Sequence, residues 1–386
     1  MAFVFWASVF LIGYAYIGYP VLLMILSSLR PRPHAVGDET PPVTVVVTAF
    51  NEEGAIAAKL DCLLAQNYPK ERMWVLVASD GSTDATDAIV ERYAPRGVQL
   101  LRVFGRKGKT EAQNQAVRSA TTEFLVFTDA TTHLEPDAVR TIMRPFADPE
   151  VGCVGGELTY ISRKQSGVGR GGVSYWGYER SIKRNESRVN SLIGVSGCFY
   201  ALRRTAYREI PAHLISDFMV ALNAYDLGFR TVYEPNARSV EETLDRGDRE
   251  FTMRVRVAVR SFGALWAMRR LLNPVKTGLF AVQLFSHKVL RYGVAPLLLT
   301  TLISSVGLVV DSTHATNPLL PLYLAALGAQ ITVYGAALAG FLIIRSGGRG
   351  VLFSKPYYFV LVNLAVLMAL VRFARGERMV TWTPVR

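Results

Sequence analysis

Four long apolar runs are the most prominent feature of the chain's hydrophobicity pattern. They occupy residues 2–29 and about 292–310, 318–344 and 356–371. A helix rises about 1.5 Å per residue, so the first three runs are long enough to cross the roughly 30 Å of hydrocarbon in a membrane. The pattern predicts a transmembrane helix at residues 1–29, about three more membrane segments within 285–373, and a tail at 374–386.

Basic residues beside these runs predict the orientation of the chain. They follow the first run, precede the second and separate the third from the fourth, at Arg30, Arg32, Lys288, Arg291, Arg345, Arg349 and Lys355. Since positive residues accumulate on the cytoplasmic side, we expect residues 30–291 in the cytoplasm and the amino terminus outside the cell (inner) membrane. Four crossings would leave the basic tail outside, so either the tail breaks the rule or the last segment is re-entrant.

Between the first two runs, strand-like segments alternate with helical patterns. The strands are predicted at 43–48, 73–79, 98–103 and 123–128, and the helices at about 53–66, 83–94 and 109–119. Buried strands that alternate with helices are typical of an α/β fold with a doubly wound parallel sheet, here in a cytoplasmic domain at 40–249. Such sheets bind ligands at the carboxyl ends of their strands.

Polar residues follow each predicted strand at that edge. They are Asn51 and Glu52, then Asp80, then the stretch GRKGK at 105–109, and finally Asp129. One Asp after a strand is a common turn or helix-cap residue. Four polar strand ends at one edge instead predict a pocket of acids beside cations, which suits a nucleotide sugar and a metal ion.

Composition narrows the function classes further. The formal net charge of +12 suits nucleic acid, anionic lipid or a phosphorylated small substrate. Because the chain is predicted to be integral to a membrane, we expect no nucleic acid polymer as partner. The three cysteines, Cys62, Cys153 and Cys198, are far apart, so neither a disulfide framework nor a zinc site is indicated.

The strand-end segments resemble, in order and spacing, the motifs of glycosyltransferase family 2. The matching stretches are VTAFNEE, VLVASDGSTDAT, GRKGKTEAQNQAV and FLVFTDATT, followed by SGCFYALRR and ISDFMVALNAYDLGFRTVYEP. The membrane layout is similar to that of the hyaluronan, chitin and cellulose synthases. The resemblance implies a GT-A-like domain that transfers a hexosyl or N-acetylhexosaminyl unit with inversion. The expected donor is a nucleotide-diphosphate sugar, UDP-linked in the first instance, and the expected acceptor is a lipid or membrane-tethered glycan.

The same resemblance implies which residues hold the donor. They are Ala49, Glu52, Asp80, Lys109, Asp129 and Arg256. Asp129 matches the first acid of the family's Asp-x-Asp motif, whereas Thr131 occupies the position of the second. Since a hydroxyl is a weaker ligand for a hard cation than a carboxylate, we expect Mg²⁺ or Mn²⁺ at Asp129 with an altered ligand set.

Asp217 matches the family's catalytic base, although Ile215 and Ser216 replace the two residues before it. An Asp at this position would also serve as the N-cap of the following amphipathic helix.

In the later stretch MRVRV, Arg256 is retained and Val257 replaces a tryptophan of processive relatives. Without that aromatic platform we expect transfer of one or a few sugars, with processive polysaccharide synthesis as the alternative. Residues 250–275 are predicted to form an amphipathic interface helix.

Two other classes explain the sequence less well. A dinucleotide-dependent oxidoreductase requires a Gly-x-Gly-x-x-Gly motif after the first strand, where this chain has AFNEE. A transporter with a regulatory nucleotide-binding domain predicts ionisable residues inside its spans, and the runs at 292–310 and 318–344 contain none.

Overall fold

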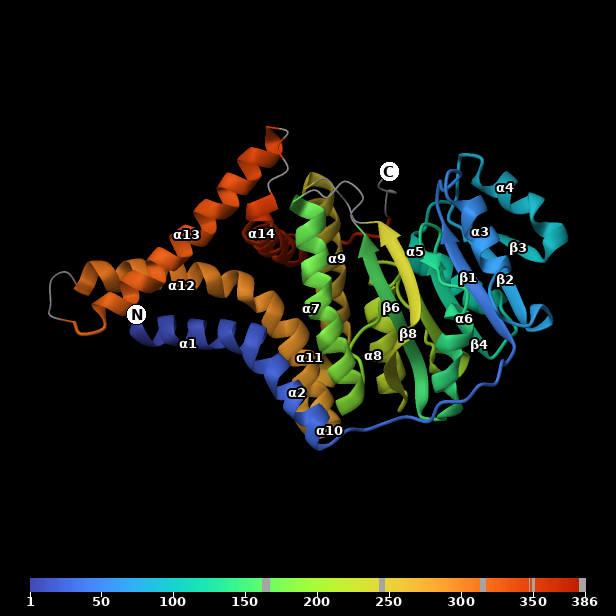
Figure 1. The fold of residues 1–386 in the computed structure, drawn as a ribbon, viewed down its shortest axis with the longest axis horizontal. Coiled ribbons are helices and arrows are strands. Elements are labelled where there is room, and N and C mark those ends of the chain that lie inside the picture. The colour runs from blue at the N-terminus through green and yellow to red at the C-terminus, as the bar shows by residue number, and fades with distance from the viewer. Residues whose placement is uncertain (162–166, 243–246, 313–316, 347, 349–350, 382–386) are drawn as a thin grey trace.

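The computed structural model describes residues 1–161, 167–242, 247–312, 317–346, 348 and 351–381. An α/β domain lies at one end and long apolar helices lie at the other (Figure 1). Between them stand helices α7 (Gly167–Val189) and α9 (Gly247–Ala267), which run roughly alongside one another. These two helices therefore lie between the α/β domain and the apolar helices.

Eight strands form one sheet in the order β3-β2-β1-β4-β7-β6-β8-β5. Their bounds are β1 (Val43–Ala49), β2 (Met73–Ser79), β3 (Val98–Arg102), β4 (Phe124–Asp129), β5 (His133–Leu134), β6 (Val151–Ile161), β7 (Phe199–Arg203) and β8 (Arg230–Glu242). The first four strands of the sheet order are parallel, as predicted. Beyond β4 the sheet is mixed, because β7 runs antiparallel to both of its neighbours.

Helices cover both faces of the sheet. Those of the α/β domain are α3 (Ile56–Leu64), α4 (Thr86–Arg92), α5 (Lys109–Ser119), α6 (Ala138–Met143) and α8 (Ser216–Asp226). In β1, Val45 and Val47 join a core with α3, α4 and α6, whereas Val46 joins the opposite core with α5 and α8. Alternate side chains of one strand are thus buried on both faces, which explains the continuous apolar runs. The predicted strands and helices of this half are confirmed.

Short 3-10 turns connect these elements. They are η2 (Lys70–Arg72), η3 (Ala94–Arg96), η4 (Arg144–Ala147), η5 (Arg204–Ala206), η6 (Arg269–Leu272) and η8 (Val351–Phe353). The helix predicted at 250–275 is shorter at its carboxyl end than expected, since α9 stops at Ala267.

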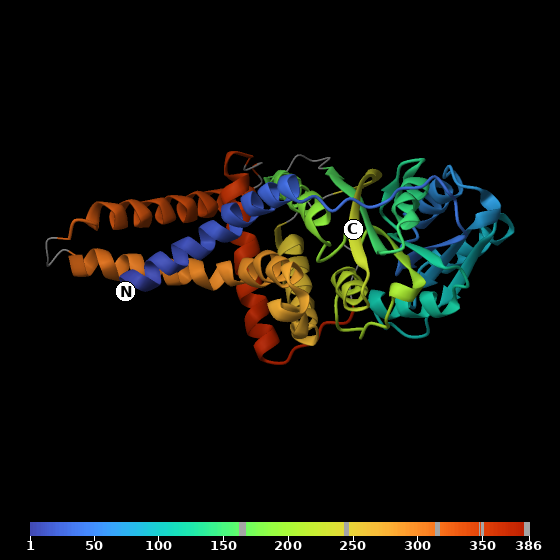
Figure 2. The same cartoon turned by 90° about the horizontal axis from the view of Figure 1, so that it is seen from below.

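Four helical stretches are long and apolar enough to cross a membrane. They comprise α1 (Ala2–Gly13) with π-helix η1 (Tyr14–Gly18) and α2 (Tyr19–Leu29), α11 (Leu279–Leu284) with π-helix η7 (Phe285–Leu290) and α12 (Arg291–Ser312), α13 (Leu320–Arg345), and α14 (Ser354–Ala374). The short α10 (Pro274–Thr277) precedes the second stretch. Helices α1, α12 and α13 run side by side, joined by contacts among Phe5, Leu308 and Tyr323, whereas α14 lies across them (Figure 2).

The last apolar helix, α14, packs against α9. Ala365, Val366 and Ala369 of α14 pack against Val255 and other apolar residues of α9. The chain then returns to the sheet, where the carbonyl oxygen of Val380 would lie 2.5 Å from a Cβ built on Gly108. The described part of the tail therefore lies against the α/β domain.

Candidate active site

The carboxyl ends of the parallel strands bring Lys109 and Asp129 together. Asp129 ends β4 and Lys109 begins α5, and the Lys109 ammonium lies 2.5 Å from Oδ1 of Asp129. The same ammonium donates a hydrogen bond to the carbonyl of Gly197 at 3.1 Å. Burial opposes the charge on Lys109, but the nearby negative groups, above all the Asp129 carboxylate, together raise the pKa of this lysine. The predicted acid and the predicted cation thus form one charged pair at the sheet edge.

Asp80 organises the loop that carries the cations. Its side chain is fully buried, and its two carboxylate oxygens accept hydrogen bonds from the backbone N–H groups of Lys107 and Gly108, each at 2.8 Å. Gly108 has φ +92°, a conformation that favours glycine. Burial raises the pKa of Asp80, and these two hydrogen bonds oppose the shift. The carboxylate therefore shapes the loop in front of Lys109, and direct contact of Asp80 with a nucleotide stays a prediction.

Thr131, at the position of the second acid of the Asp-x-Asp motif, contacts a residue from a strand that is distant along the chain. The hydroxyl of Thr131 donates a hydrogen bond to Oε1 of Glu241 at 3.2 Å, and the Cys198 thiol contacts Oε2 at 2.8 Å. Glu241 belongs to β8 and is half-buried. Burial raises its pKa, and the nearby negative charge of Asp129 raises it further. A second carboxylate is thus present beside Asp129, although it comes from another part of the chain.

A buried lysine, Lys59, forms hydrogen bonds to the residues on either side of Asp129. Lys59 of α3 is 3% exposed, and its ammonium donates hydrogen bonds to the hydroxyl of Thr128 at 2.7 Å and the carbonyl of Thr132 at 2.6 Å. Burial lowers the pKa of Lys59 to about 8. These contacts fix the chain on both sides of Asp129.

Asp217 approaches the site from the start of α8. A Cβ built on Gly197 would lie 2.9 Å from Oδ2 of Asp217, so only glycine allows this close approach. Burial raises the pKa of Asp217, while the charges of Lys109, Lys288 and Arg260 oppose the shift. Asp217 and Lys109 therefore both lie against Gly197.

Arg260 holds the segment before Asp217 against α5. Its guanidinium donates to the hydroxyl of Thr110 at 2.7 Å and to the carbonyl of Leu214 at 2.6 Å. Burial lowers the pKa of Arg260 to about 10. Because Thr110 follows Lys109 directly, this arginine couples the positions of the predicted base and the predicted cation.

The remaining predicted residues lie farther from this centre or contribute backbone. Ala49 is fully buried, and its carbonyl accepts a hydrogen bond from the Asp80 N–H at 2.9 Å. Glu52 is half-buried and its N–H donates to the Thr86 hydroxyl at 2.8 Å. Arg256 is half-buried on α9, where burial lowers its pKa. Roles of these three residues in donor binding stay predictions.

The residues at this edge fit a hard divalent cation only with help from a substrate. Within the described residues, no group of three or more His, Cys, Asp or Glu side chains is arranged to hold a metal ion. Asp129 and Glu241 offer two carboxylates close enough to influence each other electrostatically. Mg²⁺ is commonly held by one or two carboxylates together with substrate phosphates, and this donor set matches that pattern.

Residues 44–211 match the family model described as glycosyl transferase family 2. The predicted family is thereby confirmed for this segment. It contains strands β1 to β7, except for Val43, and it does not contain β8. Asp217 and Glu241 lie beyond the matched residues.

Individual proteins extend the comparison. The chain is 26% identical over 227 residues to a poly-beta-1,6-N-acetyl-D-glucosamine synthase of Staphylococcus aureus (strain MSSA476), covering 56% of this chain and 54% of that protein. It is 27% identical over 226 residues to an N-acetylglucosaminyltransferase of Rhizobium sp. (strain N33), covering 54% of this chain and 50% of that protein. The chain thus spans about half the length of the curated relatives it matches.

A solved structure resembles nearly the whole chain. The mannosyltransferase from Pyrobaculum calidifontis, in complex with GDP-Man and Mn²⁺, superposes with a TM-score of 0.71 at 22% sequence identity. The superposition covers 97% of this chain and 100% of that one. The likeness confirms the predicted fold class, including the apolar helices beside the α/β domain.

Sequence reasoning missed Glu241, Lys59 and Arg260. A lysine on the otherwise apolar face of α3 was a signal for Lys59, since such a residue must find buried acceptors. Glu241 comes near the end of a long strand, like the other polar strand-end residues. Its partner Thr131 lies 110 residues away, and nothing in the local sequence connects them.

Proposed function

We propose that the protein is a membrane-bound inverting glycosyltransferase that moves a sugar from a nucleotide-diphosphate donor to a lipid or membrane-tethered glycan. The observation that carries this proposal is the meeting of Lys109, Asp129 and Asp217 around Gly197. A cation, an acid suited to a metal–diphosphate and a separate carboxylate are the groups that this displacement requires.

Asp217 acts as the base in this proposal. The acceptor hydroxyl attacks the anomeric carbon, its proton passes to the Asp217 carboxylate, and the bond to the donor's diphosphate breaks. Burial keeps the pKa of Asp217 above that of an ordinary aspartate, which brings it nearer the operating pH and strengthens it as a base. Lys109 offsets charge on the departing diphosphate.

A divalent cation completes the donor site. Asp129 and Glu241 would hold it, and when bound it would neutralise charge on the diphosphate. The Mn²⁺ in the similar mannosyltransferase supports the choice of metal. Lys59 maintains the segment 128–132 on which Asp129 is carried.

The donor is proposed to carry a hexose or N-acetylhexosamine. UDP-N-acetylglucosamine is the first candidate because two relatives are named for N-acetylglucosamine transfer or polymerisation, and GDP-mannose is the second because of the similar mannosyltransferase. The test is release of the nucleoside diphosphate, UDP or GDP, by the purified protein in nanodiscs with each nucleotide sugar. Release from none of the donors, with and without Mn²⁺ and a lipid extract as acceptor source, would contradict the proposal.

Polymer synthesis is the second candidate. Trp176 of α7 lies 5.0 Å from Tyr160 between ring centres, so an aromatic pair is present although Val257 supplies none. Trp266 of α9, another tryptophan of the chain, is 65% exposed. We retain transfer of one or a few sugars as the proposal and test it by product length.

A further inference from the structure

The helix that carries Asp217 packs on the second apolar stretch. The ring of Tyr225, near the end of α8, is stacked on the ring of Phe280 in α11, with 3.6 Å between ring centres and 8° between ring planes. The Tyr225 hydroxyl also donates a hydrogen bond to the carbonyl of Thr277 at 3.1 Å. The carboxyl-terminal end of α8 is therefore held by α10 and α11.

A lysine of the same stretch lies at the other end of α8. Lys288 of η7 is half-buried, and its ammonium lies 5.1 Å from the ring centre of Phe218, the residue that follows Asp217. The ammonium also lies 5.9 Å from the ring centre of Tyr292. The face of an aromatic ring attracts a cation at such distances. The two rings thus hold the charge of Lys288 beside the first turn of α8.

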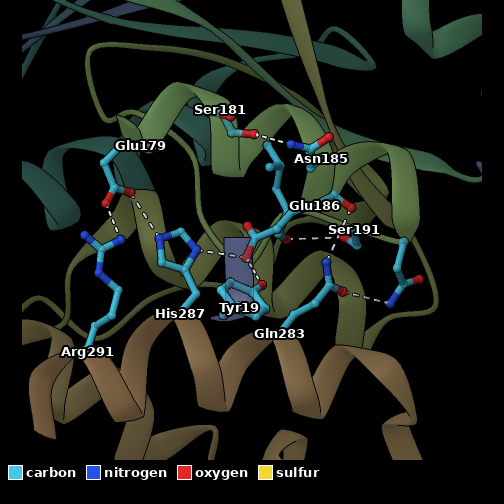
Figure 3. A network of polar contacts seen from close by, with 11 residues as sticks. Tyr19, Glu179, Ser181, Asn185, Glu186, Ser191, Gln283, His287 and Arg291 are labelled. Atoms are coloured by element: carbon cyan, nitrogen blue, oxygen red, sulfur yellow. Dashed lines mark hydrogen bonds and ion pairs between the residues drawn. The ribbon is translucent and has the colours of Figure 1, made fainter. Parts of the chain in front are cut away.

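Contacts with α7 hold the residues around Lys288 (Figure 3). His287 is 6% exposed, and its Nδ1 lies 2.8 Å from Oε1 of Glu186. Its Nε2 lies 3.1 Å from Oε2 of Glu179, and the same glutamate pairs with Arg291. The residue before Lys288 and the residue three positions after it are both bound to α7, so the position of Lys288 is well determined.

Asp217 is surrounded mainly by positive groups. The charged and titratable side chains that interact with it electrostatically come from five elements: Lys109 of α5, Lys183 of α7, Tyr200 of β7, Arg260 of α9 and Lys288 of η7. Burial raises the pKa of Asp217, and the charges of Lys109, Lys288 and Arg260 oppose the rise. Of these five side chains, Lys288 is the one that belongs to an apolar stretch.

Two of the other cations are bound to groups of their own. The Lys109 ammonium contacts the Asp129 carboxylate, and the Arg260 guanidinium donates to the carbonyl of Leu214 at 2.6 Å. Each of these charges is therefore partly offset before it acts on Asp217.

The charge of Lys288 acts on two carboxylates, Glu179 and Asp217. Glu179 is already paired with Arg291 and in contact with His287, so it retains two partners without Lys288. Asp217 is therefore the carboxylate for which the charge of Lys288 matters more.

We propose that Lys288 is a positioning residue for the catalytic base: held over Phe218, its charge stabilises the Asp217 carboxylate in the form that takes the acceptor's proton. This proposal rests on the proposed function and gives the second apolar stretch a part in the chemistry of the α/β domain. Burial favours the neutral carboxyl group, and a nearby cation favours the carboxylate. Loss of the Lys288 charge therefore moves the ionisation of Asp217 to higher pH.

The first measurement follows Asp217 without turnover. Infrared difference spectra of the full chain in nanodiscs, recorded over a series of pH values, detect the carbonyl stretch of a protonated carboxyl group, and Asp217→Asn identifies the band. We expect the band to persist to higher pH in Lys288→Gln and in Lys288→Met, which keeps an unbranched stem over the ring. Lys288→Arg is expected to restore the wild-type midpoint, and Lys276→Gln, exposed on α10, to leave it unchanged.

The second measurement is the pH profile of kcat/KM for UDP-N-acetylglucosamine, with a lipid extract as acceptor source. On the acid limb, kcat/KM of Lys288→Gln is expected to be about two- to tenfold below that of the wild type, whereas above the limb the two agree within about twofold. A lysine that only packs η7 on α8 would lower the whole profile evenly. A lysine that only binds the acceptor would raise the amount of lipid extract required without moving the limb. Either profile, or an infrared midpoint that does not move, overturns the proposal.

These outcomes separate the inference from the proposed function. A wild-type protein that releases UDP or GDP from a nucleotide sugar, with an infrared midpoint that Lys288→Gln does not move, contradicts only the inference. A midpoint that moves in a protein that releases no nucleoside diphosphate from any donor contradicts the proposed function and leaves the effect of Lys288 on Asp217 in place.

Discussion

The Thr131 hydroxyl donates a 3.2 Å hydrogen bond to Glu241, so the position of the missing motif acid is connected to an acid from β8. This relationship predicts how the chain binds metal. Glu241→Gln removes one of two carboxylates, and we expect affinity for Mn²⁺ in the presence of UDP to fall about 10- to 100-fold. Electron paramagnetic resonance of free Mn²⁺ measures the change.

A substitution that adds an acid at the same edge provides the control. Thr131→Asp restores the second acid of the motif and is expected to tighten Mn²⁺ binding. If Glu241→Gln leaves the metal affinity unchanged, Glu241 only orients Thr131 and Cys198. Full activity in excess chelator would show that this edge works without metal.

Asp217→Asn is expected to lower the turnover about 10²- to 10⁴-fold while the affinity for UDP stays nearly constant. The carboxamide keeps the shape next to Gly197 but cannot accept the proton. Turnover near that of the wild type would reduce Asp217 to a helix cap. Isothermal titration with UDP and single-turnover kinetics measure the two quantities.

The same residue predicts the acid limb of the pH profile. Burial raises the pKa of Asp217, so the inactive protonated form persists to a higher pH than for an exposed aspartate. Activity is therefore lost as pH falls through this raised pKa and is regained above it. The profile of kcat/KM at saturating metal checks this, and a limb at the position typical of an exposed aspartate would contradict it.

Asp80→Ala is expected to weaken nucleoside diphosphate binding by loosening the loop before Lys109. Two charge-assisted hydrogen bonds to the backbone are lost, each worth about 1.5–3 kcal/mol. Titration with UDP measures the affinity, and hydrogen exchange at Lys107 and Gly108 reports the loop. Faster exchange with unchanged affinity would restrict Asp80 to a structural role, and no change in either would remove both roles.

The carboxyl-terminal tail is expected on the same side of the membrane as the α/β domain. Val380 contacts Gly108, and α14 lies across the other apolar helices, so α14 is predicted to rest at the interface. An epitope tag after the last residue should be detected in spheroplasts only after permeabilisation. The same tag between α12 and α13 serves as the opposite control. Detection of both tags in intact spheroplasts would restore the four-crossing topology.

Product length tests the role of the aromatic pair. With Val257 in place of an aromatic, we expect products extended by one or a few sugars. Trp176→Ala is expected to weaken acceptor retention up to roughly tenfold, the scale of a lost stacking contact of about 0.5–1.5 kcal/mol. Trp266→Ala, at an exposed position, is the matched control. A ladder of long polymer at limiting enzyme would favour the processive alternative.

Sequence by itself determined the elements whose signals are local. Apolar periodicity located the parallel strands and the long helices, because burial on both faces requires continuous apolar runs. It also located Asp129 and Lys109 at a common edge, since parallel strands bring their carboxyl ends together. The family followed from the spacing of those motifs.

Tertiary structure alone decided the contacts between residues distant along the chain. Glu241 reaches Thr131 because β8 is added to the far half of a mixed sheet, whose strand order has no periodic signal. The tail reaches Gly108 because α14 packs on α9. Hydropathy alone does not distinguish an apolar helix that packs on another helix from one that crosses the membrane. His287 of η7 contacts Glu179 and Glu186 of α7, which only the folded chain brings within reach.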